Sequence, residues 1–342
     1  MRHNFPEDYQ HHIFLIAEIG LNHNGDYHTA EKMILSAASS GADAVKFQTY
    51  NPDLMYSVYT KSLMENGTEG NADRSIIDFF RTFCFSFDEL QRLKKVADDA
   101  NVRFFSAPFD IESVDLLERL GVSLFKVASS EVTHTRLLEK IAKCGKPVIM
   151  STGISSEEEI SSAVDFLSDV PLSLLHCVSL YPLEPSDAHL SRISALKKRF
   201  DLPVGFSDHN PGNDLALFAS YAGASIIEKH FTLARDFPCP DGNVSITPEQ
   251  MSFLRKSLDQ ALLVMGNSEI SSGKSEEKVA KSARRSLFAS RDISAGEIIT
   301  SDDIIEKRPG VGVPASLWRS FIGKKTSCRI SKDYLLRNEF FQ

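Results

Sequence analysis

The chain has 342 residues, of which 42% are hydrophobic and 25% are charged, a composition typical of folded domains with a buried core. Its net charge of -8, with no long basic run, excludes a nucleic-acid-binding surface as the main function. The polar first residues lack an apolar signal-type core, and no later run reaches the length of a membrane span, so we expect a cytoplasmic protein without membrane contact. Five widely spaced cysteines without a C-x-x-C pair predict reduced thiols.

From residue 13 onward, short apolar runs alternate with stretches that carry apolar residues at three- and four-residue spacing. This alternation is typical of βα units that build a parallel sheet. The predicted strands are Ile13–Ile19, Ala44–Thr49, Val102–Ala107, Leu124–Ser129, Pro147–Thr152, Leu172–Val178, Pro203–Asp208 and Ser225–His230. The helical stretches include Thr29–Ser40, Glu112–Leu120, Ser156–Leu167, Leu215–Ala222 and Thr247–Met265.

Eight such units predict an α/β fold of the closed (β/α)8 TIM-barrel type over residues 1–265. An open doubly wound sheet would also alternate, but no Gly-x-Gly-x-x-Gly follows the first strand. The connection from Asn51 to Ser86 is too long for a simple turn, and it leaves the end of a strand where barrel active sites lie. We therefore expect a lid or a substrate-contacting insertion there.

The composition changes after the predicted barrel. Residues 266–282 are rich in Ser, Lys, Glu and Gly without a sustained apolar face, which predicts a linker. Residues 283–342 contain short alternating runs and frequent turn signals, which predict a small β-rich domain. With about sixty residues, such a domain has a thin core and would gain stability by packing against a barrel.

Two histidines close neighbouring strands of the predicted barrel. His209 ends the seventh strand and His230 ends the eighth, so both imidazoles would leave the same rim. Neutral imidazole is a common ligand of divalent metals, although a single strand-end histidine can equally be a hydrogen-bonded structural residue. Polar residues also end the other strands, and this rim builds the active site of TIM barrels. They include Glu18, Lys46, Gln48, Lys126, Ser129, Glu131, Ser151, Tyr181, Ser207 and Glu228.

Lys46 and Lys126 lie inside apolar strands, where an unpaired charge is costly. One interpretation is a pair of buried salt bridges with Glu18 or Glu131. Another is a cationic floor that binds a phosphate or carboxylate with the help of nearby serine hydroxyls. A third is a Schiff-base lysine, as in barrel aldolases.

Several motifs occur in a fixed order along the chain. They are Ile16-Ala-Glu-Ile-Gly-Leu-Asn-His-Asn-Gly25, Gly41-Ala-Asp-Ala-Val-Lys-Phe-Gln-Thr49, Ser151-Thr-Gly153, Gly205-Phe-Ser-Asp-His209, Glu228-Lys-His-Phe-Thr232, Pro240-Asp241 and Lys307-Arg-Pro-Gly-Val-Gly312. In these motifs the chain resembles the sialic acid synthase family, which makes the nonulosonic acids N-acetylneuraminate, legionaminate and pseudaminate. The last motif resembles that family's C-terminal antifreeze-like (SAF, β-clip) domain.

The resemblance implies a transferase that condenses phosphoenolpyruvate with an N-acetylated amino hexose, either N-acetylmannosamine or a 6-deoxy diacetamido analogue. The reaction would require a divalent metal and release phosphate by C–O cleavage. The implied metal ligands for Mn²⁺ or Mg²⁺ are His209 and His230. Residues implied to bind phosphoenolpyruvate are Lys46, Lys126, Ser151 and Ser207, with Ser129 as a further substrate contact. Those implied to face the sugar are Gln48, Glu131, Tyr181 and Asp241.

The family resemblance also implies roles in catalysis and assembly. Glu18, Glu131 and Lys46 are the implied catalytic residues, with Glu18 assisting proton transfer near the attacking water. Arg308 would reach the sugar from the partner subunit in a domain-swapped homodimer.

The chain departs from the family pattern at two positions. Ala107 stands where a Thr is expected, and Ser179 stands where an Asn is expected. These departures leave the sugar open. The alternative functions are a 3-deoxy-aldulosonate phosphate synthase, a Schiff-base pyruvate aldolase, or a binding module on a degenerate barrel.

Overall fold

The structure is a computed structural model that describes residues 12–66, 70–266, 269–271 and 273–342. The chain divides into two compact units, residues 1–266 and residues 267–342. All five cysteines lie in the described ranges as free thiols. Within those ranges, no helix is both long enough and apolar enough to cross a membrane.

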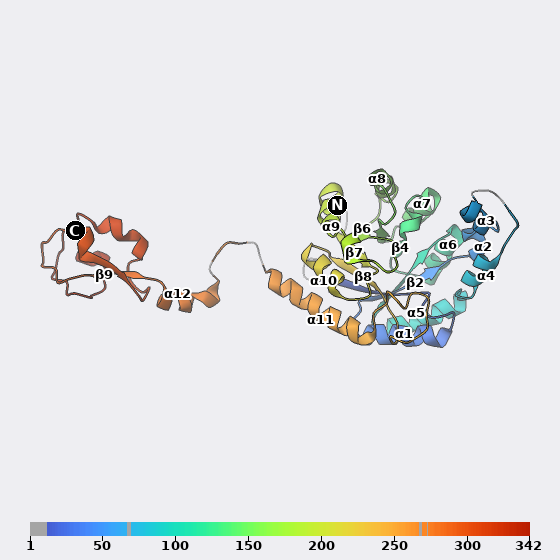
Figure 1. Cartoon of the computed structure of the whole chain (residues 1–342), viewed down its shortest axis with the longest axis horizontal. Coiled ribbons are helices and arrows are strands. Elements are labelled where there is room, and N and C mark those ends of the chain that lie inside the picture. The colour runs from blue at the N-terminus through green and yellow to red at the C-terminus, as the bar shows by residue number, and fades with distance from the viewer. Residues whose placement is uncertain (1–11, 67–69, 267–268, 272) are drawn as a thin grey trace. The chain divides into compact units, whose positions relative to one another are not determined.

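Eight parallel strands in chain order close into a barrel, as the sequence predicts (Figure 1). The strands are β1 Phe14–Gly20, β2 Ala44–Thr49, β3 Arg103–Pro108, β4 Phe125–Val127, β5 Val148–Ser151, β6 Leu172–Cys177, β7 Val204–Asp208 and β8 Ile226–His230. A long helix follows each strand on the outside. These helices are α1 Tyr27–Ser39, α5 Phe87–Asp99, α6 Ile111–Leu120, α7 Thr135–Lys143, α8 Glu157–Phe166, α9 Ser191–Phe200, α10 Asp214–Tyr221 and α11 Pro248–Met265.

Capping residues set the start of several helices. The Ser86 hydroxyl accepts a hydrogen bond from the backbone N–H of Glu89, whose carboxylate accepts one from the N–H of Ser86. The same reciprocal arrangement joins Ser156 to Glu159 at the start of α8. Ser156, predicted as the first residue of this helix, is therefore its N-cap.

The connection from Asn51 to Ser86, expected to form a lid or a substrate-contacting insertion, contains three short helices. They are α2 Pro52–Met55, α3 Thr60–Asn66 and α4 Ser75–Arg81. The ring of Tyr56 stacks on that of Phe80 at a centroid distance of 5.1 Å, and Asp53 forms ion pairs with both Arg74 and Arg81. The segment is therefore a folded insertion with its own contacts.

Inside the barrel, the side chains change from apolar to polar between one inward-facing residue of a strand and the next. Its lower layer is the fully buried cluster Phe14, Ile16, Ala44, Phe105, Leu124, Ile149, Leu175 and Ile226. Residues two positions further along a strand point to the same face. On five strands this next position is polar and buried, namely Glu18, Lys46, Lys126, Ser151 and Glu228. The fold thus gathers ionisable groups above an apolar floor.

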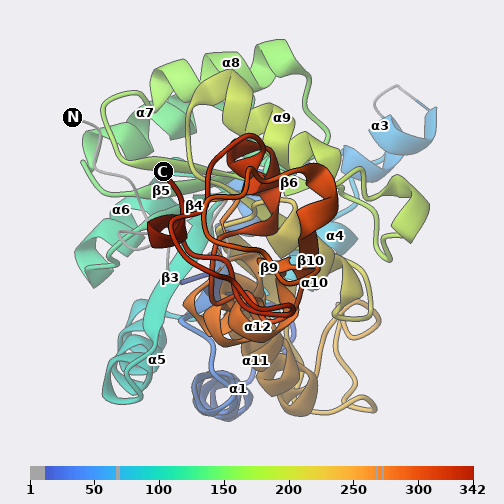
Figure 2. The same ribbon diagram turned by 90° about the vertical axis from the view of Figure 1, so that its left-hand side faces the viewer.

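The C-terminal unit is small and β-rich. Strands β9 Ser286–Ala289 and β10 Ile304–Lys307 pair antiparallel (Figure 2). Its core includes Leu287, Ile293, Phe321, Ile330 and Leu336. The segment 266–282, expected to be a linker, includes the 3-10 turn Lys274–Glu276 and most of helix α12 Glu277–Ala283. Residues 267, 268 and 272 of that segment lie outside the described ranges.

Candidate active site

A cavity of about 270 Å³ opens at the carboxyl ends of the barrel strands, and every strand or the loop after it contributes to its lining. Ten residues to which the sequence analysis assigned a role in the site come together there. They are Glu18, Lys46, Gln48, Lys126, Ser129, Ser151, Tyr181, Ser207, His209 and His230. The lining also contains Ala107 and Ser179, the two positions at which the chain departs from the family pattern.

Lys46 lies between two buried carboxylates. Its Nζ is 3.2 Å from Oε2 of Glu18 and 3.2 Å from Oε1 of Glu228. Strand register explains the contact, because β1 pairs with both β2 and β8 and aligns Glu18 with Lys46 on one side and with His230 on the other. The hydroxyl of Ser207 donates a hydrogen bond to Oε1 of Glu228 at 3.0 Å. Lys46 is therefore already paired.

The pKa values of Glu18 and Glu228 are shifted in opposite directions. Burial raises the pKa of Glu18, and this outweighs the attraction of Lys46. Burial acts on Glu228 as well, but Lys46 and Lys126 together outweigh it and lower the pKa of Glu228. Two neighbouring acids whose pKa values are pushed apart provide one proton carrier and one permanent charge. Glu18 is the group suited to carry a proton.

Lys126 is the other buried cation of the cavity. Its Nζ donates hydrogen bonds to Oγ of Ser151 at 2.6 Å and to the backbone carbonyl of Val127 at 3.0 Å. In the described part of the chain, no carboxylate lies within ion-pairing distance of this ammonium. Burial lowers its pKa to about 8. Lys126 is thus a cation that can take an anionic ligand without breaking a salt bridge.

The two histidines lie next to each other at the ends of the neighbouring strands β7 and β8, with ring centroids 5.5 Å apart. Nδ1 of His209 lies 2.9 Å from the carbonyl of Val178, which can only accept a hydrogen bond, so Nε2 carries the lone pair. Burial and the neighbouring His230 lower the pKa of His209 to about 3. His209 therefore offers a neutral nitrogen to the cavity.

The chain matches two known protein families. Residues 33–270 match the NeuB family, and residues 284–342 match the SAF domain. The chain belongs to the NeuB family. It is 37% identical to the N,N'-diacetyllegionaminic acid synthase of Campylobacter jejuni, over 94% of this chain and 98% of that one. It is 32% identical to the pseudaminic acid synthase of the same organism, over 99% of both chains.

A solved structure of a similar protein shares the NeuB-family fold. It is the N-acetylneuraminic acid synthetase of Leptospira borgpetersenii in complex with citrate, with a TM-score of 0.72 and 34% identity. The match covers 79% of this chain and 90% of that one. Together with the curated relatives, it identifies this NeuB-family chain as an enzyme of the nonulosonic acid synthase class.

His209 and His230 are the residues of this cavity that could hold a divalent metal. Nδ1 of His230 is buried and makes no hydrogen bond within the described residues, although Oδ2 of Asp241 lies 3.3 Å away. Burial works against a proton on His230, yet that carboxylate outweighs it and raises the imidazole pKa, so the site attracts positive charge. Among the residues that the structure describes, no three His, Cys, Asp or Glu side chains form a metal-binding group. An ion here would have two protein ligands and open positions for water or substrate.

Two of the expected NeuB-family site residues, Glu131 and Asp241, do not line this cavity. Glu131 lies in the turn after β4 and contacts Nδ1 of His134 at 2.9 Å, so the local turn directs its carboxylate to a neighbour. The carboxylate of Asp241 lies 3.3 Å from Nδ1 of His230, and its backbone N–H donates to Oδ1 of Asn22. Arg308 belongs to the C-terminal unit, where it is exposed.

The structure also shows roles that the sequence did not predict. Glu228 appeared there only as a polar strand end, and its contact with Lys46 depends on closure of the barrel. Lys229 points away from the cavity and is fully buried with Asp208, at 3.0 Å from Oδ2. The same ammonium donates to the carbonyl of Gly212 at 2.8 Å, which fixes the loop that follows His209.

Proposed function

We propose that this NeuB-family enzyme condenses phosphoenolpyruvate with an N-acetylated amino hexose and releases a nonulosonic acid and inorganic phosphate. The observation that carries the proposal is the unpaired Lys126 ammonium beside the Ser151 hydroxyl, in a cavity where Glu18 and Glu228 have opposite pKa shifts. A buried cation with hydroxyl neighbours suits a small, highly charged anion. The relatives, whose names describe synthases of such acids, support the same reaction.

Phosphoenolpyruvate binds where the buried cations lie. Lys126 and the hydroxyls of Ser129 and Ser151 offer donors to the phosphate, whereas the ion-paired Lys46 faces the carboxylate end. Four ionisable groups lie here, namely Glu18, Glu228, Lys46 and Lys126. If Glu18 is protonated, their net charge is +1, because only Glu228 then opposes the two lysines. An anionic substrate is therefore compatible with the two glutamates.

The bond changes follow from the placement of Glu18. The electron pair of the enol double bond attacks the aldehyde carbon and forms the new C–C bond, and protonated Glu18 donates its proton to the aldehyde oxygen. The resulting oxocarbenium carbon, C2, takes the oxygen of a water molecule, and Glu18 accepts the proton that this water loses. The new C2 hydroxyl then gives its proton to the departing phosphate as the C–O bond to phosphate breaks, which leaves a 2-keto acid and free phosphate. These steps do not use Glu131, whose carboxylate lies 2.9 Å from Nδ1 of His134.

We propose that His209 and His230 hold Mn²⁺ or Mg²⁺. When bound, the ion supplies Lewis-acid polarisation of the sugar aldehyde. Tyr181 and Gln48 line the same cavity and would orient the acetamido and hydroxyl groups of the sugar. Asp241 would act by orienting His230 rather than by touching the sugar directly.

We infer that the sugar is a 6-deoxy hexose with two acetamido groups. The similarity to the N,N'-diacetyllegionaminic acid synthase supports this choice over N-acetylmannosamine, since the product of that relative is diacetylated by its name. Ser179 and Ala107 are smaller than the residues expected at their positions, and both leave more room in the cavity. We further propose that the enzyme is a domain-swapped homodimer in which Arg308 of one subunit reaches the sugar of the other.

A substrate panel tests the proposed reaction. The protein, phosphoenolpyruvate and Mn²⁺ are incubated with N-acetylmannosamine, with the 2,4-diacetamido-6-deoxy hexoses, or with a phosphorylated aldose, and the products are weighed by mass spectrometry. We expect phosphate release and a nine-carbon acid with a diacetamido sugar, and none after metal chelation. Turnover of the phosphorylated aldose alone would show a 3-deoxy-aldulosonate phosphate synthase instead.

A Schiff-base aldolase is the second candidate because the pKa of Lys126 is lowered to about 8, which makes its amine more nucleophilic. Borohydride added with pyruvate would then attach a three-carbon adduct to Lys126, with or without chelator. The condensation proposed above predicts no adduct.

A further inference from the structure

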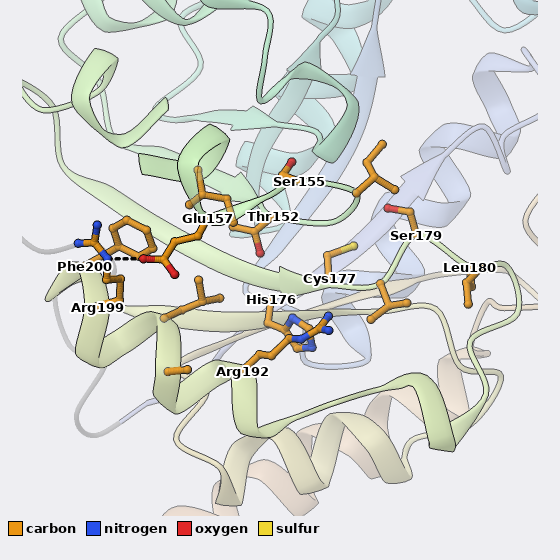
Figure 3. Close-up of a pocket in the computed structure, with 15 residues that line it drawn as sticks. Thr152, Ser155, Glu157, His176, Cys177, Ser179, Leu180, Arg192, Arg199 and Phe200 are labelled. Carbon is orange, nitrogen blue, oxygen red and sulfur yellow. Dashed lines mark hydrogen bonds and ion pairs between the residues drawn. The ribbon is translucent and has the colours of Figure 1, made fainter. Parts of the chain in front are cut away.

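A second cavity lies on the outer side of β6, between α8 and α9 (Figure 3). Its volume is about 570 Å³, which exceeds the 270 Å³ of the active-site cavity. The two cavities share three lining residues, Ile154, Cys177 and Ser179, at the ends of β5 and β6. The larger cavity therefore adjoins the reaction site from the side of the barrel.

The phosphate end of the substrate lies next to this boundary. The charged carboxylate of Glu228 lies on β8, and it repels a phosphate toward the unpaired Lys126 on β4. Beyond Lys126, the hydroxyls of Ser129 and Ser179 converge at Gly153. A Cβ atom at Gly153 would lie 2.8 Å from the first hydroxyl oxygen and 2.5 Å from the second.

The phosphate end is also the deep end of the site. Lys126 is 1% exposed, whereas Tyr181, which lines the sugar side, is 55% exposed. Phosphate is thus set free beneath a bulky product that still occupies the open side of the barrel. It must either wait for that product to leave or depart sideways.

The side cavity has the charge that a departing phosphate needs. Arg192 of α9 points into it beside His176 (Figure 3), and no carboxylate within the described ranges pairs with its guanidinium. Burial lowers the pKa of His176, whose Nε2 lies 2.7 Å from the carbonyl of Ala188, so Arg192 is the charge at this point. The one carboxylate in the lining, Glu157, is neutralised by Nε of Arg199 at 2.6 Å.

We propose that inorganic phosphate leaves the active site through the cavity between α8 and α9, with Arg192 as its binding site on the way out. This inference rests on the proposed condensation, which supplies the phosphate. The small side chains Ser179 and Cys177 lie at the boundary that the phosphate would cross.

Two variants of α9 test the path. Ala195→Phe narrows the cavity, and Arg192→Gln removes its unpaired charge. Their matched controls, Ser194→Phe and Lys198→Gln, change exposed residues of the same helix outside the lining. Rapid quench measures formation of the nine-carbon acid in the first turnover, and a fluorescent phosphate-binding protein measures free phosphate.

The proposal predicts that all four variants form product at the wild-type rate. Only in the two cavity variants does free phosphate lag behind product, by about tenfold for Arg192→Gln because a hydrogen bond to a charged group is lost. Simultaneous appearance of product and free phosphate in Ala195→Phe and Arg192→Gln would overturn it.

A binding measurement separates this proposal from the reaction itself. Calorimetric titration of the free protein with inorganic phosphate requires no turnover, and it should show weaker binding for Arg192→Gln than for Lys198→Gln. If wild-type protein forms no product, the proposed condensation is wrong. Equal phosphate affinity in the two variants overturns the Arg192 site whether or not product forms.

Discussion

The hydroxyl oxygen of Tyr181 lies 2.9 Å from Nε2 of His209, and the two rings stack with centroids 4.0 Å apart. Since the other nitrogen of His209 donates to the carbonyl of Val178, the hydroxyl donates its hydrogen bond to the only lone pair that the imidazole can offer. A metal that binds this nitrogen must therefore displace the tyrosine hydroxyl.

Tyr181→Phe should bind Mn²⁺ about two- to tenfold more tightly than the wild type, because the competing hydrogen bond is worth about 0.5–1.5 kcal/mol. Calorimetric titration of metal-free protein measures this directly. Tyr50→Phe is the control, since its hydroxyl contacts the carbonyl of Phe80, away from the histidines. Unchanged or weaker metal binding in Tyr181→Phe would show that the hydroxyl does not compete.

The lowered pKa of Lys126 predicts how the reaction with phosphoenolpyruvate depends on pH. Its pKa of about 8 means that the ammonium is charged below this pH and neutral above it. We expect kcat/KM for phosphoenolpyruvate to be constant up to about pH 8 and then to fall about tenfold per pH unit. Lys126→Arg, which stays charged, should be less active at pH 7 but show no fall between pH 8 and pH 9. An identical alkaline fall in both proteins would assign it to another group.

The lowered pKa of Lys126 also affects stability, which should change with pH in the opposite direction to activity. The free energy of unfolding should rise with pH between about 8 and 10.5, because the unfolded chain keeps a proton on Lys126 that the folded chain has lost. Chemical denaturation at several pH values measures the slope, with Lys126→Met as the control that removes it.

Lys229→Met should lower the free energy of unfolding by about 3–5 kcal/mol, because it leaves the fully buried Asp208 without its counter-ion. Urea denaturation provides the measurement. The double variant with Asp208→Asn should recover part of the loss. Lys95→Met breaks an exposed pair with Asp99 and should cost less than about 1 kcal/mol. A similarly small loss in Lys229→Met would mean that water reaches Asp208.

Arg308 tests the proposed exchange of domains between subunits. Arg308→Ala and His209→Ala should each abolish most activity, and mixing the two variants under conditions of subunit exchange should restore part of it. The restored activity comes from dimers in which an intact barrel meets an intact Arg308. With exchange verified by mass-labelled subunits, a mixture that stays inactive would exclude action across the dimer.

Periodicity predicts most of the barrel because each strand and helix repeats its own pattern over enough residues. The short helices α2, α3 and α4 have four to seven residues each, too few for a pattern to appear, so no helix was predicted in this connection. Strand β4 ends two residues earlier than predicted because Ser129 begins a 3-10 turn.

For the candidate site, the sequence predicts which residues lie at the rim but not which residues they contact. Strand ends predict that Lys46, Lys126 and the two histidines lie together, since parallel strands finish at one rim. The contacts that these residues make within the rim could not be predicted, because they depend on the register between strands that are far apart in sequence. Lys46 meets Glu228 across about 180 residues only when β1 and β8 pair, whereas Glu131 is diverted by a histidine three residues away.

The step from apolar to charged residues inside the barrel also bears on how the chain finds its fold. A slip of one residue in β1, β2 or β4 would turn Glu18, Lys46 or Lys126 outward into the apolar layer beneath the helices. An unpaired charge there costs several kcal/mol, whereas a slipped apolar strand would lose only part of its packing. The groups that perform the chemistry thus also reject misaligned strands while the barrel forms, so neutralising them should broaden the set of competing folding intermediates as well as abolish turnover.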